Sequence, residues 1–242
     1  MSRARCGILH AGSQSRDPGF RLASWTRLCS APLRKCYALR CVRGTQGAAV
    51  LRFHLFTNDR RFYNSVMMTL EIRPASEPDL AAVTDIYDHA VRTGTATFEL
   101  IPPDLAEMTR RFKALTDGGF PYLAAGLDGR VIGYAYAGPY RPRPAYRFTV
   151  ENSVYLAPSI HRRGIGTQLL RRLIVECEAR GHRQMIAVIG DSANAGSIGV
   201  HLRNGFAMIG THPNVGFKFG RWLDTVMMQR ALGEGAATLP DT

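Results

Sequence analysis

Residues 161–173 read HRRGIGTQLLRRL and lead from an apolar segment into an amphipathic one. Gly164 and Gly166 stand where a strand gives way to a helix, and Arg162 and Arg163 precede them. Glycines at such a turn let main-chain amides approach a ligand, and the first turn of a helix carries unpaired N–H groups at the positive end of its dipole. The pattern indicates an anion site suited to a phosphate or pyrophosphate, although a glycine-rich strand–helix turn can also be only a turn.

The chain around this turn alternates between strand-like and helix-like patterns. Apolar residues recur at steps of three and four from residue 79 to 91, which predicts a helix, and Asp128-Gly129 between two apolar runs predicts a hairpin. The other predicted helices are residues 104–115, 166–180 and 195–203. The predicted strands are residues 69–75, the hairpin at 121–140, and residues 146–158, 184–190, 205–211 and 222–232. Hairpins early and strand–helix–strand crossings late predict a single α+β domain with three layers, α/β/α.

The positive charge of the chain is concentrated at its beginning. Residues 1–67 contain twelve Lys and Arg and two acids, a net charge of +10, and the remaining 175 residues contain nineteen basic and seventeen acidic side chains, a net charge of +2. Because no basic stripe with interleaved aromatic residues runs through the second part, we expect it to bind no nucleic acid. No run of eighteen apolar residues occurs, so no membrane-spanning helix is expected.

Residues 1–67 show no sustained helical or strand period and contain at most one short basic helix, so we expect a basic, disordered leader. Three interpretations of it are open: an organellar transit peptide, a nucleic-acid-binding arm, or upstream sequence translated from a wrongly chosen start codon. The third is favoured, because a start at Met67 or Met68 would leave a complete domain at residues 68–232. The tail, residues 233–242, is expected to be disordered.

The cysteines and histidines form no metal-site pattern. Four of the five cysteines lie in the leader without CxxC pairs, and Cys177 lies on a predicted helix, where it is best explained as a small apolar residue. This usage is typical of a protein in the reducing cytoplasm. Because no His/Cys/Asp cluster has ligand spacing, we expect no metal.

Two motifs resemble those of the GNAT superfamily of acetyl-CoA-dependent N-acetyltransferases. The first, Q/R-x-x-G-x-G/A, matches residues 161–166, with His161 where the family usually has Gln or Arg. The second, Asn-Ala-x-Ser followed later by Gly-Phe, begins at Asn194 and ends at Phe206. The stretches IYDHAV, GYAYAGPYRPRPAYRFTVENSVYL and VGFKFGRWLDTVMMQ resemble the phosphinothricin and methionine sulfoximine N-acetyltransferases within that superfamily. The resemblance covers about residues 69–231 and implies the GNAT fold, with a central mixed, mostly antiparallel sheet.

The resemblance implies acetyl-CoA as co-substrate and assigns residues to it. Main-chain groups of Val154, Tyr155 and Leu156 are expected to pair with the pantetheine arm as another strand would. Asn194 is expected to touch the pantetheine or the thioester end. The amides expected to hold the pyrophosphate are those of Arg162, Arg163, Gly164, Ile165, Gly166 and Thr167.

Two residues are implied to take part in catalysis. Glu151 matches the family's general base, which removes a proton from the substrate ammonium directly or through water, since a protonated amine cannot attack. A main-chain N–H of its strand could stabilise the resulting oxyanion. His201 stands where many members have a Tyr that acts as general acid. The alternatives are that Glu151 is a solvated strand residue, sharing a face with Thr149 and Ser153, and that His201 is a structural histidine.

The stretch RPRPAY matches the family's substrate segment, with Pro144, Ala145 and Tyr146 in the contact positions. Arg141 or Arg147 could pair bidentately with the carboxylate or phosphinate of an amino-acid analogue. Residues 95–99, TATFE, are implied to form part of the substrate wall.

The expected function is therefore transfer of an acetyl group from acetyl-CoA to the α-amino group of a small amino-acid analogue such as phosphinothricin or methionine sulfoximine or sulfone. Two alternatives stay open: acetylation of another amine, such as a polyamine, an aminoglycoside or a protein N-terminus, and a non-catalytic acyl-CoA-binding module. The nearly neutral body argues against polycationic substrates. The family's habit implies a homodimer, and no membrane or nucleic-acid partner is expected.

Overall fold

The computed structural model describes residues 69–240 and, as main chain only, residues 37–43 and 49–55. Its strands form one sheet in the order β1-β2-β3-β4-β5-β6-β7-β9-β8. Among the strands of the described residues, β6 and β7 alone are parallel, so the mixed, mostly antiparallel sheet predicted from the sequence is confirmed. The strands are β1 Tyr37–Arg43, β2 Ala49–Leu55, β3 Thr69–Pro74, β4 Tyr122–Leu127, β5 Arg130–Pro139, β6 Thr149–Leu156, β7 Gln184–Gly190, β8 Ala207–Lys218 and β9 Arg221–Ala231. The helices are α1 Leu80–Thr93, α2 Leu105–Asp117, α3 Ile165–Ala179 and α4 Ala195–Arg203.

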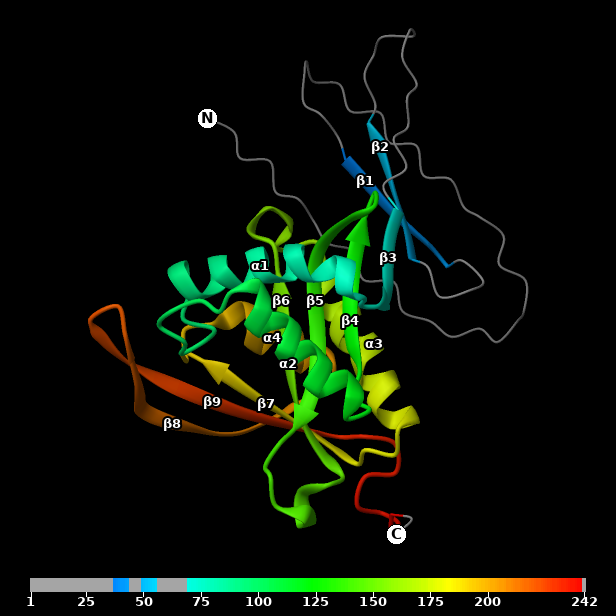
Figure 1. The fold of residues 1–242 in the computed structure, drawn as a ribbon. Helices are drawn as coiled ribbons and strands as arrows, with labels where there is room; N and C mark the ends of the chain where they lie inside the picture. The colour runs from blue at the N-terminus through cyan, green and yellow to red at the C-terminus, as the bar shows by residue number, and fades with distance from the viewer. Residues whose placement is uncertain (1–36, 44–48, 56–68, 241–242) are drawn as a thin grey trace, which may run out of the picture. The chain divides into compact units, whose positions relative to one another are not determined.

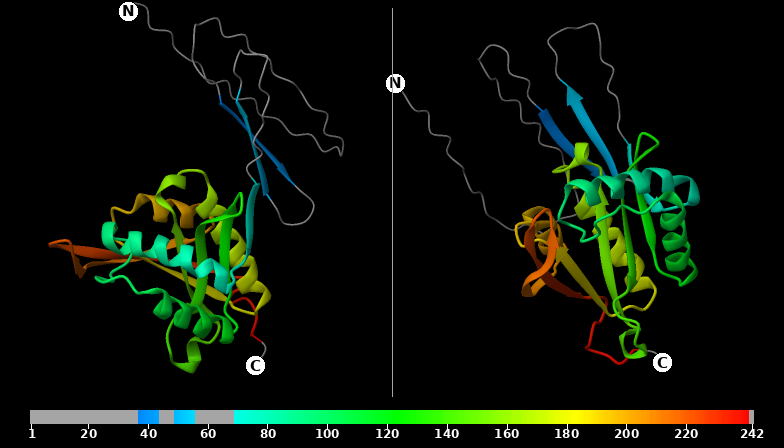
Figure 2. Two further views of the ribbon diagram at one scale, coloured as in Figure 1. Left: turned by 45° about the horizontal axis from the view of Figure 1, so that its top comes forward. Right: turned by 60° about the vertical axis from the view of Figure 1, so that its left-hand side comes forward.

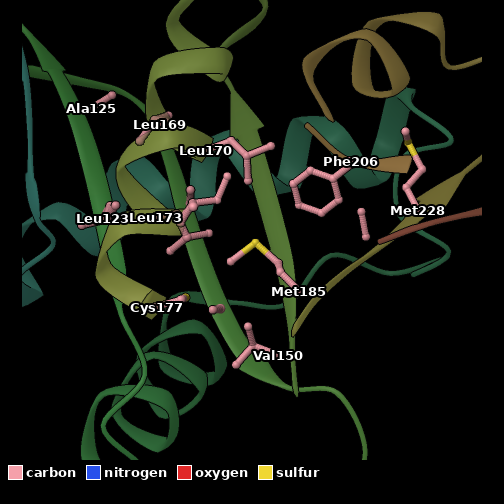
Figure 3. Close-up of a cluster of buried hydrophobic side chains, with 14 of the residues drawn as sticks. Leu123, Ala125, Val150, Leu169, Leu170, Leu173, Cys177, Met185, Phe206 and Met228 are labelled. Carbon is pink, nitrogen blue, oxygen red and sulfur yellow. The ribbon is translucent and has the colours of Figure 1, made fainter. Parts of the chain in front are cut away.

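Helices cover both faces of the sheet, which gives the three layers predicted from the sequence (Figures 1 and 2). Helices α3 and α4 pack on one face over a core that includes Leu169, Leu173 and Met185 (Figure 3). Cys177 is buried in the same core, and burial raises the pKa of its thiol to about 12, so the prediction of an apolar role is confirmed. On the opposite face α1 and α2 cover a second core that is rich in tyrosine.

Local chemistry explains most element boundaries. Asp128 and Gly129 both have positive φ, 49° and 77°, as the predicted two-residue turn between β4 and β5 requires. Helix α2 begins at the N-cap Asp104, whose side chain accepts a hydrogen bond from the Glu107 amide at 2.8 Å. Gly181, with φ 80°, follows the end of α3, as the sequence predicted.

The structure differs from the sequence prediction in three places. Residues 37–43, where at most a short basic helix was expected in a disordered leader, form β1, which pairs with β2 over seven residue pairs. The two strands are neighbours in the chain, paired from Arg43 opposite Ala49 to Tyr37 opposite Leu55, and the sequence of the leader has no sustained period of two that would have indicated them. Residues 49–55 of the same expected leader form β2. The remaining leader residues and the start at Met67 or Met68 lie outside the described residues.

The two other differences lie near the C-terminus. Strand β8 continues past residue 211 to Lys218, because β9 supplies a partner that tolerates two register shifts. The tail was expected to be disordered, but residues 233–240 form turns. Arg183 holds them by donating to the Thr238 hydroxyl at 3.1 Å and to the Leu239 carbonyl at 3.5 Å, contacts that composition alone does not indicate.

Across the described residues, the structure contains no helix whose length and apolar character would let it cross a membrane.

A partly buried ion pair joins β3 to the start of α1. The Arg73 guanidinium donates to both carboxylate oxygens of Asp79 at 2.7 Å, and the Ser76 amide and hydroxyl donate to the same carboxylate at 2.8 and 2.9 Å. The hydrogen bond from Arg73 is the main cause that lowers the pKa of Asp79 from 3.8 to about 2. This contact fixes the position of α1 on the sheet.

We expect Asp79→Asn to lower the free energy of unfolding by about 2 kcal/mol at pH 7, because the folded-state pKa lies below the unfolded one. A carboxylate with a lowered pKa stabilises the fold above its unfolded pKa and loses that contribution as pH falls. The difference between wild type and variant should therefore shrink below about pH 4, which urea unfolding at pH 7 and pH 3 measures. Asp88→Asn, which removes an exposed pair with Arg92, is the matched control and should lower the free energy of unfolding much less than Asp79→Asn does, because solvent screens an exposed pair. Equal losses in both variants would contradict the prediction.

Candidate active site

Strands β6 and β7 begin as a parallel pair and then separate. The pairing runs from Thr149 opposite Gln184 to Asn152 opposite Ala187, and in the described chain no ladder joins the two strands beyond that pair. Each strand keeps its other neighbour, since β6 pairs with β5 as far as Leu156 and β7 pairs with β9 along its whole length. The strands diverge visibly in Figure 1. Main-chain groups of both strands therefore face a cleft that opens within the sheet.

Residues from both sides of the sheet line this cleft. Ala96 comes from the segment between α1 and α2, and Asn194, Ser197 and His201 come from α4. The strand residues in the lining are Asn152, Ser153, Val154 and Tyr155 from β6 and Ala187, Val188, Ile189 and Gly190 from β7. The cleft is thus lined by the two separated strands and by side chains from the helical layers on both faces of the sheet.

The glycine turn predicted as an anion site forms the start of α3. Gly164 is the N-cap, with φ 75°, a conformation that favours glycine. The Gln168 amide donates to the Gly164 carbonyl at 3.2 Å, which is the first hydrogen bond of the helix. The amides before Gln168 in the first turn have no carbonyl one turn earlier to which they could donate. Residues 161–164 are exposed. This geometry suits a phosphate.

Gly164 and Gly166 are needed for different reasons, although the sequence predicted that both bring main-chain amides close to a ligand. A Cβ on Gly164 would meet nothing within 4 Å, so this glycine is needed for its backbone conformation. A Cβ on Gly166 would lie 3.4 Å from Leu156 and 3.6 Å from Val200, so it would point into the protein. Gly166 therefore serves the close packing of α3 against β6 and α4.

Of the residues predicted for acetyl-CoA, Val154, Tyr155 and Asn194 line the cleft. The end of β6 contacts the start of α3 through Leu156, and Asn194 caps α4 at the cleft by accepting the Ser197 amide at 3.1 Å. The Nε2 atom of His161 lies 3.4 Å from the Leu156 carbonyl oxygen, which places this residue at the same junction. A free strand edge that leads to a helix N-terminus fits an extended ligand with a phosphate at one end.

Glu151 lies one residue before the strands separate. It is opposite Gly138 on β5 and Ile186 on β7, and its side chain is half-buried on the face covered by α1 and α2. Desolvation raises the pKa of Glu151, and the nearby charge of Arg141 opposes that shift. A carboxylate with a raised pKa beside a cleft has the properties of a general base.

His201 is 4% exposed and engages both of its ring nitrogens. Nδ1 lies 2.8 Å from the Ser197 carbonyl oxygen, and Nε2 lies 2.9 Å from Oδ1 of Asn152. Burial lowers the pKa of His201, and the hydrogen bond to Ser197 opposes that shift. Both neighbouring atoms are acceptor oxygens and a neutral imidazole carries one N–H, so the ring donates to one of them at a time. This buried, enclosed geometry favours a positioning role, and the role of general acid stays a prediction.

Asn152 is a cleft residue that the sequence analysis did not single out. Its side-chain amide donates to the Ile186 carbonyl at 3.1 Å while its oxygen faces His201. It therefore bonds β7 and α4 at the point where the ladder ends. The one indication of Asn152 in the sequence is that it is a polar residue within a predicted strand, directly after Glu151.

The predicted substrate segment lies in the exposed connection between β5 and β6. Pro144, Ala145 and Tyr146 form a short 3₁₀ turn there. The Arg141 guanidinium lies 4.5 Å from the centre of the Tyr140 ring, and that of Arg147 lies 4.5 Å from the centre of the Phe148 ring. The structure brings Arg141 within electrostatic reach of Glu151, whereas Arg147 has no such effect on its pKa.

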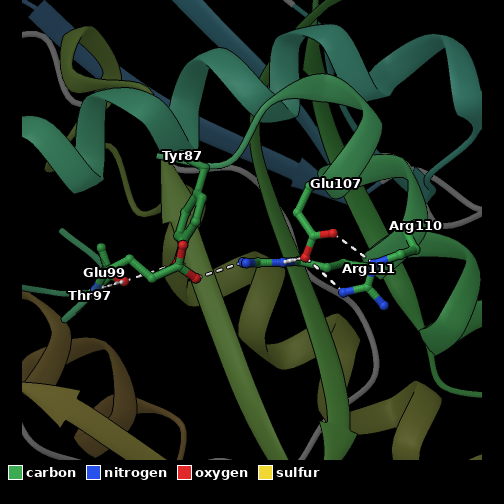
Figure 4. A network of polar contacts seen from close by, with 6 residues as sticks. All are labelled: Tyr87, Thr97, Glu99, Glu107, Arg110 and Arg111. Carbon is green, nitrogen blue, oxygen red and sulfur yellow. Dashed lines mark hydrogen bonds and ion pairs between the residues drawn. The ribbon is translucent and has the colours of Figure 1, made fainter. Parts of the chain in front are cut away.

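A polar network joins α1, the segment 95–99 and α2 (Figure 4). The Tyr87 hydroxyl is 2.9 Å from the Thr97 hydroxyl and donates to Glu99 at 3.0 Å, and Arg111 donates to Glu99 at 2.6 Å. Burial is the main cause that raises the pKa of Tyr87 to about 12. Tyr87 lies within the apolar period that predicted the first helix, and that period gives no indication of the contact made by its hydroxyl.

Comparison with known proteins agrees with this geometry. Residues 83–206 match the model of the acetyltransferase (GNAT) family. The chain is 54% identical over 170 residues to phosphinothricin N-acetyltransferase of Alcaligenes faecalis, which covers 70% of this chain and 86% of that protein. It is 44% identical over 163 residues to an L-methionine sulfoximine/L-methionine sulfone acetyltransferase of Pseudomonas aeruginosa, which covers 67% of this chain and 94% of that protein.

A solved structure shares the fold as well as the sequence. It is a GNAT superfamily phosphinothricin acetyltransferase from Sinorhizobium meliloti in complex with acetyl-CoA, 50% identical, with a TM-score of 0.69 over 71% of this chain and 93% of that chain. With the open β6–β7 cleft, the glycine turn at α3 and the family match over residues 83–206, the conclusion is plain: this chain belongs to the GNAT family of acetyltransferases.

Proposed function

We propose that this protein transfers the acetyl group of acetyl-CoA to the α-amino group of a small amino-acid analogue, with phosphinothricin and methionine sulfoximine or sulfone as the leading candidates. The observation that carries the proposal is a half-buried glutamate, Glu151, whose pKa is raised by burial and which lies one residue before β6 and β7 separate. The names of the relatives from Alcaligenes faecalis and Pseudomonas aeruginosa support the substrate class.

The proposed cofactor site follows the free edge of β6. Main-chain groups of residues 154–156 would pair with the pantetheine arm, and the first-turn amides of α3 would hold the pyrophosphate, with Arg162 and Arg163 beside them. Asn194 would lie at the thioester end, since it lines the cleft. When bound, acetyl-CoA supplies an activated acyl group.

The proposed chemistry assigns a separate task to each group of residues. Glu151 accepts a proton from the substrate ammonium, because the amine attacks only after it is deprotonated. A main-chain N–H on the free edge of β6 would stabilise the negative charge that develops on the acyl oxygen. As the new N–C bond forms, the C–S bond of the thioester would break and coenzyme A would leave as its thiolate. Arg141 pairs with the acidic group of the amino-acid analogue and keeps it next to Glu151.

We expect Glu151→Gln to lower kcat by about 10²- to 10⁴-fold, because the amide cannot accept the proton. The dissociation constant for acetyl-CoA should stay unchanged, since the cofactor contacts are main-chain groups farther along β6. Steady-state kinetics with an amino-acid analogue panel and calorimetric titration with acetyl-CoA measure the two quantities.

The matched control is Glu71→Gln, which changes an exposed glutamate on β3 and should leave both quantities unaltered. Turnover of Glu151→Gln at the wild-type rate would exclude Glu151 as the base. Acetyl-CoA binding by the wild type with no turnover of any amine tested would instead indicate a binding module.

The pH dependence of kcat tests the electrostatics of the base. Burial raises the pKa of Glu151 above its ordinary 4.5, and the rate should fall as pH drops through that raised pKa, because the base must be deprotonated. In Arg141→Met the opposing positive charge is lost, so the pKa of Glu151 should rise further. The acid limb of the pH–kcat profile, where the rate falls as pH drops, should then move to higher pH. Arg147→Met is the control and should leave the acid limb in place. A limb that stays fixed or moves to lower pH in Arg141→Met would refute the coupling.

We also propose that two copies associate through the β8–β9 hairpin. Strand β8 is the edge strand of the sheet, and large apolar side chains on the hairpin are exposed: Met208, Ile209, Val215, Phe217, Phe219 and Trp222. Light scattering during gel filtration should give twice the mass of the chain. A Phe217→Asp, Trp222→Asp double variant should give the mass of one chain, and a wild-type monomer would contradict the proposal.

A further inference from the structure

The segment between α1 and α2 closes one side of the β6–β7 cleft. Ala96 is part of the cleft lining, on the opposite side from the α4 residues. The segment from Gly94 to Glu99 has no regular secondary structure, so its position depends on the contacts that its neighbours make with it. Several of these contacts come from the C-terminal strands, within the stretch VGFKFGRW, to which the proposed mechanism gives no role.

The most buried of these contacts is made by Lys218, the last residue of β8. Its side chain is 3% exposed, and its ammonium donates to the Gly94 carbonyl at 3.0 Å and to the Thr97 carbonyl at 2.8 Å. The two carbonyls lie on either side of Ala96 in the sequence. Desolvation lowers the pKa of Lys218, and the charge of Glu99 opposes that shift. Burying a charged group is unfavourable unless partners compensate it, and here main-chain carbonyls of a single segment do so.

A second contact lies directly beside the first. The Phe98 ring covers Gly216, where a Cβ would lie only 2.3 Å from the ring, and also approaches Gly190 at the end of β7, where a Cβ would lie 2.9 Å from it. Any side chain at Gly216 would therefore push Phe98 away. The aromatic ring and the lysine together attach the segment to β8 across more than a hundred residues of chain.

A third contact connects the segment to the cofactor side of the cleft. Asp191, at the end of β7, accepts a hydrogen bond from the Thr95 hydroxyl at 3.0 Å and from the Ala193 amide at 3.0 Å, and it is also paired with Arg221. Ala193 immediately precedes Asn194, the N-cap of α4. The segment and the start of α4 are thus held by the same carboxylate.

We propose that Lys218 is a positioning residue for the acceptor substrate: by holding the carbonyls of Gly94 and Thr97, it keeps Ala96 and its neighbours in place as the wall against which the amine docks. The inference goes beyond the proposed function. It depends on that function in one respect: the amine substrate is taken to bind on the side of the cleft formed by residues 94–99. Lys218 touches neither substrate nor cofactor and acts through the segment. Small displacements of a substrate-positioning wall are costly to an enzyme, because the reacting atoms must be held in a narrow range of geometry.

The test uses Lys218→Met in the full chain, which keeps the length of the side chain and removes its charge and its donors. The KM for the acceptor should rise about tenfold or more, since two hydrogen bonds from a charged group are lost, while kcat changes less and the dissociation constant for acetyl-CoA stays unchanged. Hydrogen exchange of the protein without ligands should become faster at the amides of residues 94–99 and stay unchanged in α3. Lys113→Met, which removes an exposed lysine paired with Glu77, is the matched control and should change none of these quantities.

If Lys218→Met does not fold, Thr95→Val provides the second variant, because it releases the same segment from Asp191 without altering the buried lysine. It should shift the acceptor KM and the exchange rates in the same direction by a smaller factor. Unchanged exchange at residues 94–99 would overturn the anchoring role of Lys218. Faster exchange with an unchanged acceptor KM would overturn the role of the segment as the acceptor wall. If the wild type acetylates no amino-acid analogue, the proposed function fails, whereas the exchange experiment still decides whether Lys218 holds the segment.

Discussion

The separation of β6 from β7 is the constraint on which the rest of the structure depends. Opening two paired strands in the middle of a sheet leaves main-chain donors and acceptors without partners, and such groups are costly unless a ligand or water satisfies them. The chain limits this cost by keeping β6 paired with β5 and β7 paired with β9, so only the inner edges are free. Asn152 ends the ladder by bonding the Ile186 carbonyl and His201. The cleft is therefore maintained by the outer pairings and a single buried amide.

The alternation of side chains along β6 distributes the chemistry of the site between two layers. Glu151 faces α1 and α2, whereas the next residue, Asn152, faces α4 and bonds His201. Because the sheet is open at this point, groups from both layers reach one cleft, with Ala96 on one side and Asn194 on the other. The core on Glu151's side of the sheet is rich in tyrosine, and burial of the Glu151 carboxyl raises its pKa.

Elements whose information is local were predictable from the sequence. The apolar period of α1, the Asp128-Gly129 turn and the glycine turn before α3 each depend on residues within a few positions of one another. The prediction was wrong where pairing or contact with another segment decides the conformation. Strand β1 depends on β2, the extent of β8 depends on β9, and the C-terminal turns depend on Arg183. For the same reason, the sequence indicated Glu151 and the amides of α3 through their motifs, but it gave no role to Asn152, Asp191 or Lys218, whose partners lie far away along the chain.

The sequence by itself determined the family, the order of helices and strands after residue 69, and the candidate base, because motifs and periods are properties of neighbouring residues. Only the tertiary structure decided that the two glycines of HRRGIGT differ, with Gly164 adopting a left-handed conformation and Gly166 packing against Leu156 and Val200. It also decided that both nitrogens of His201 are engaged and that a lysine near the C-terminus holds the segment after α1. The physical reason is the same in each case: burial and hydrogen-bond partners arise from contacts across the sheet, and these are formed only when the chain folds.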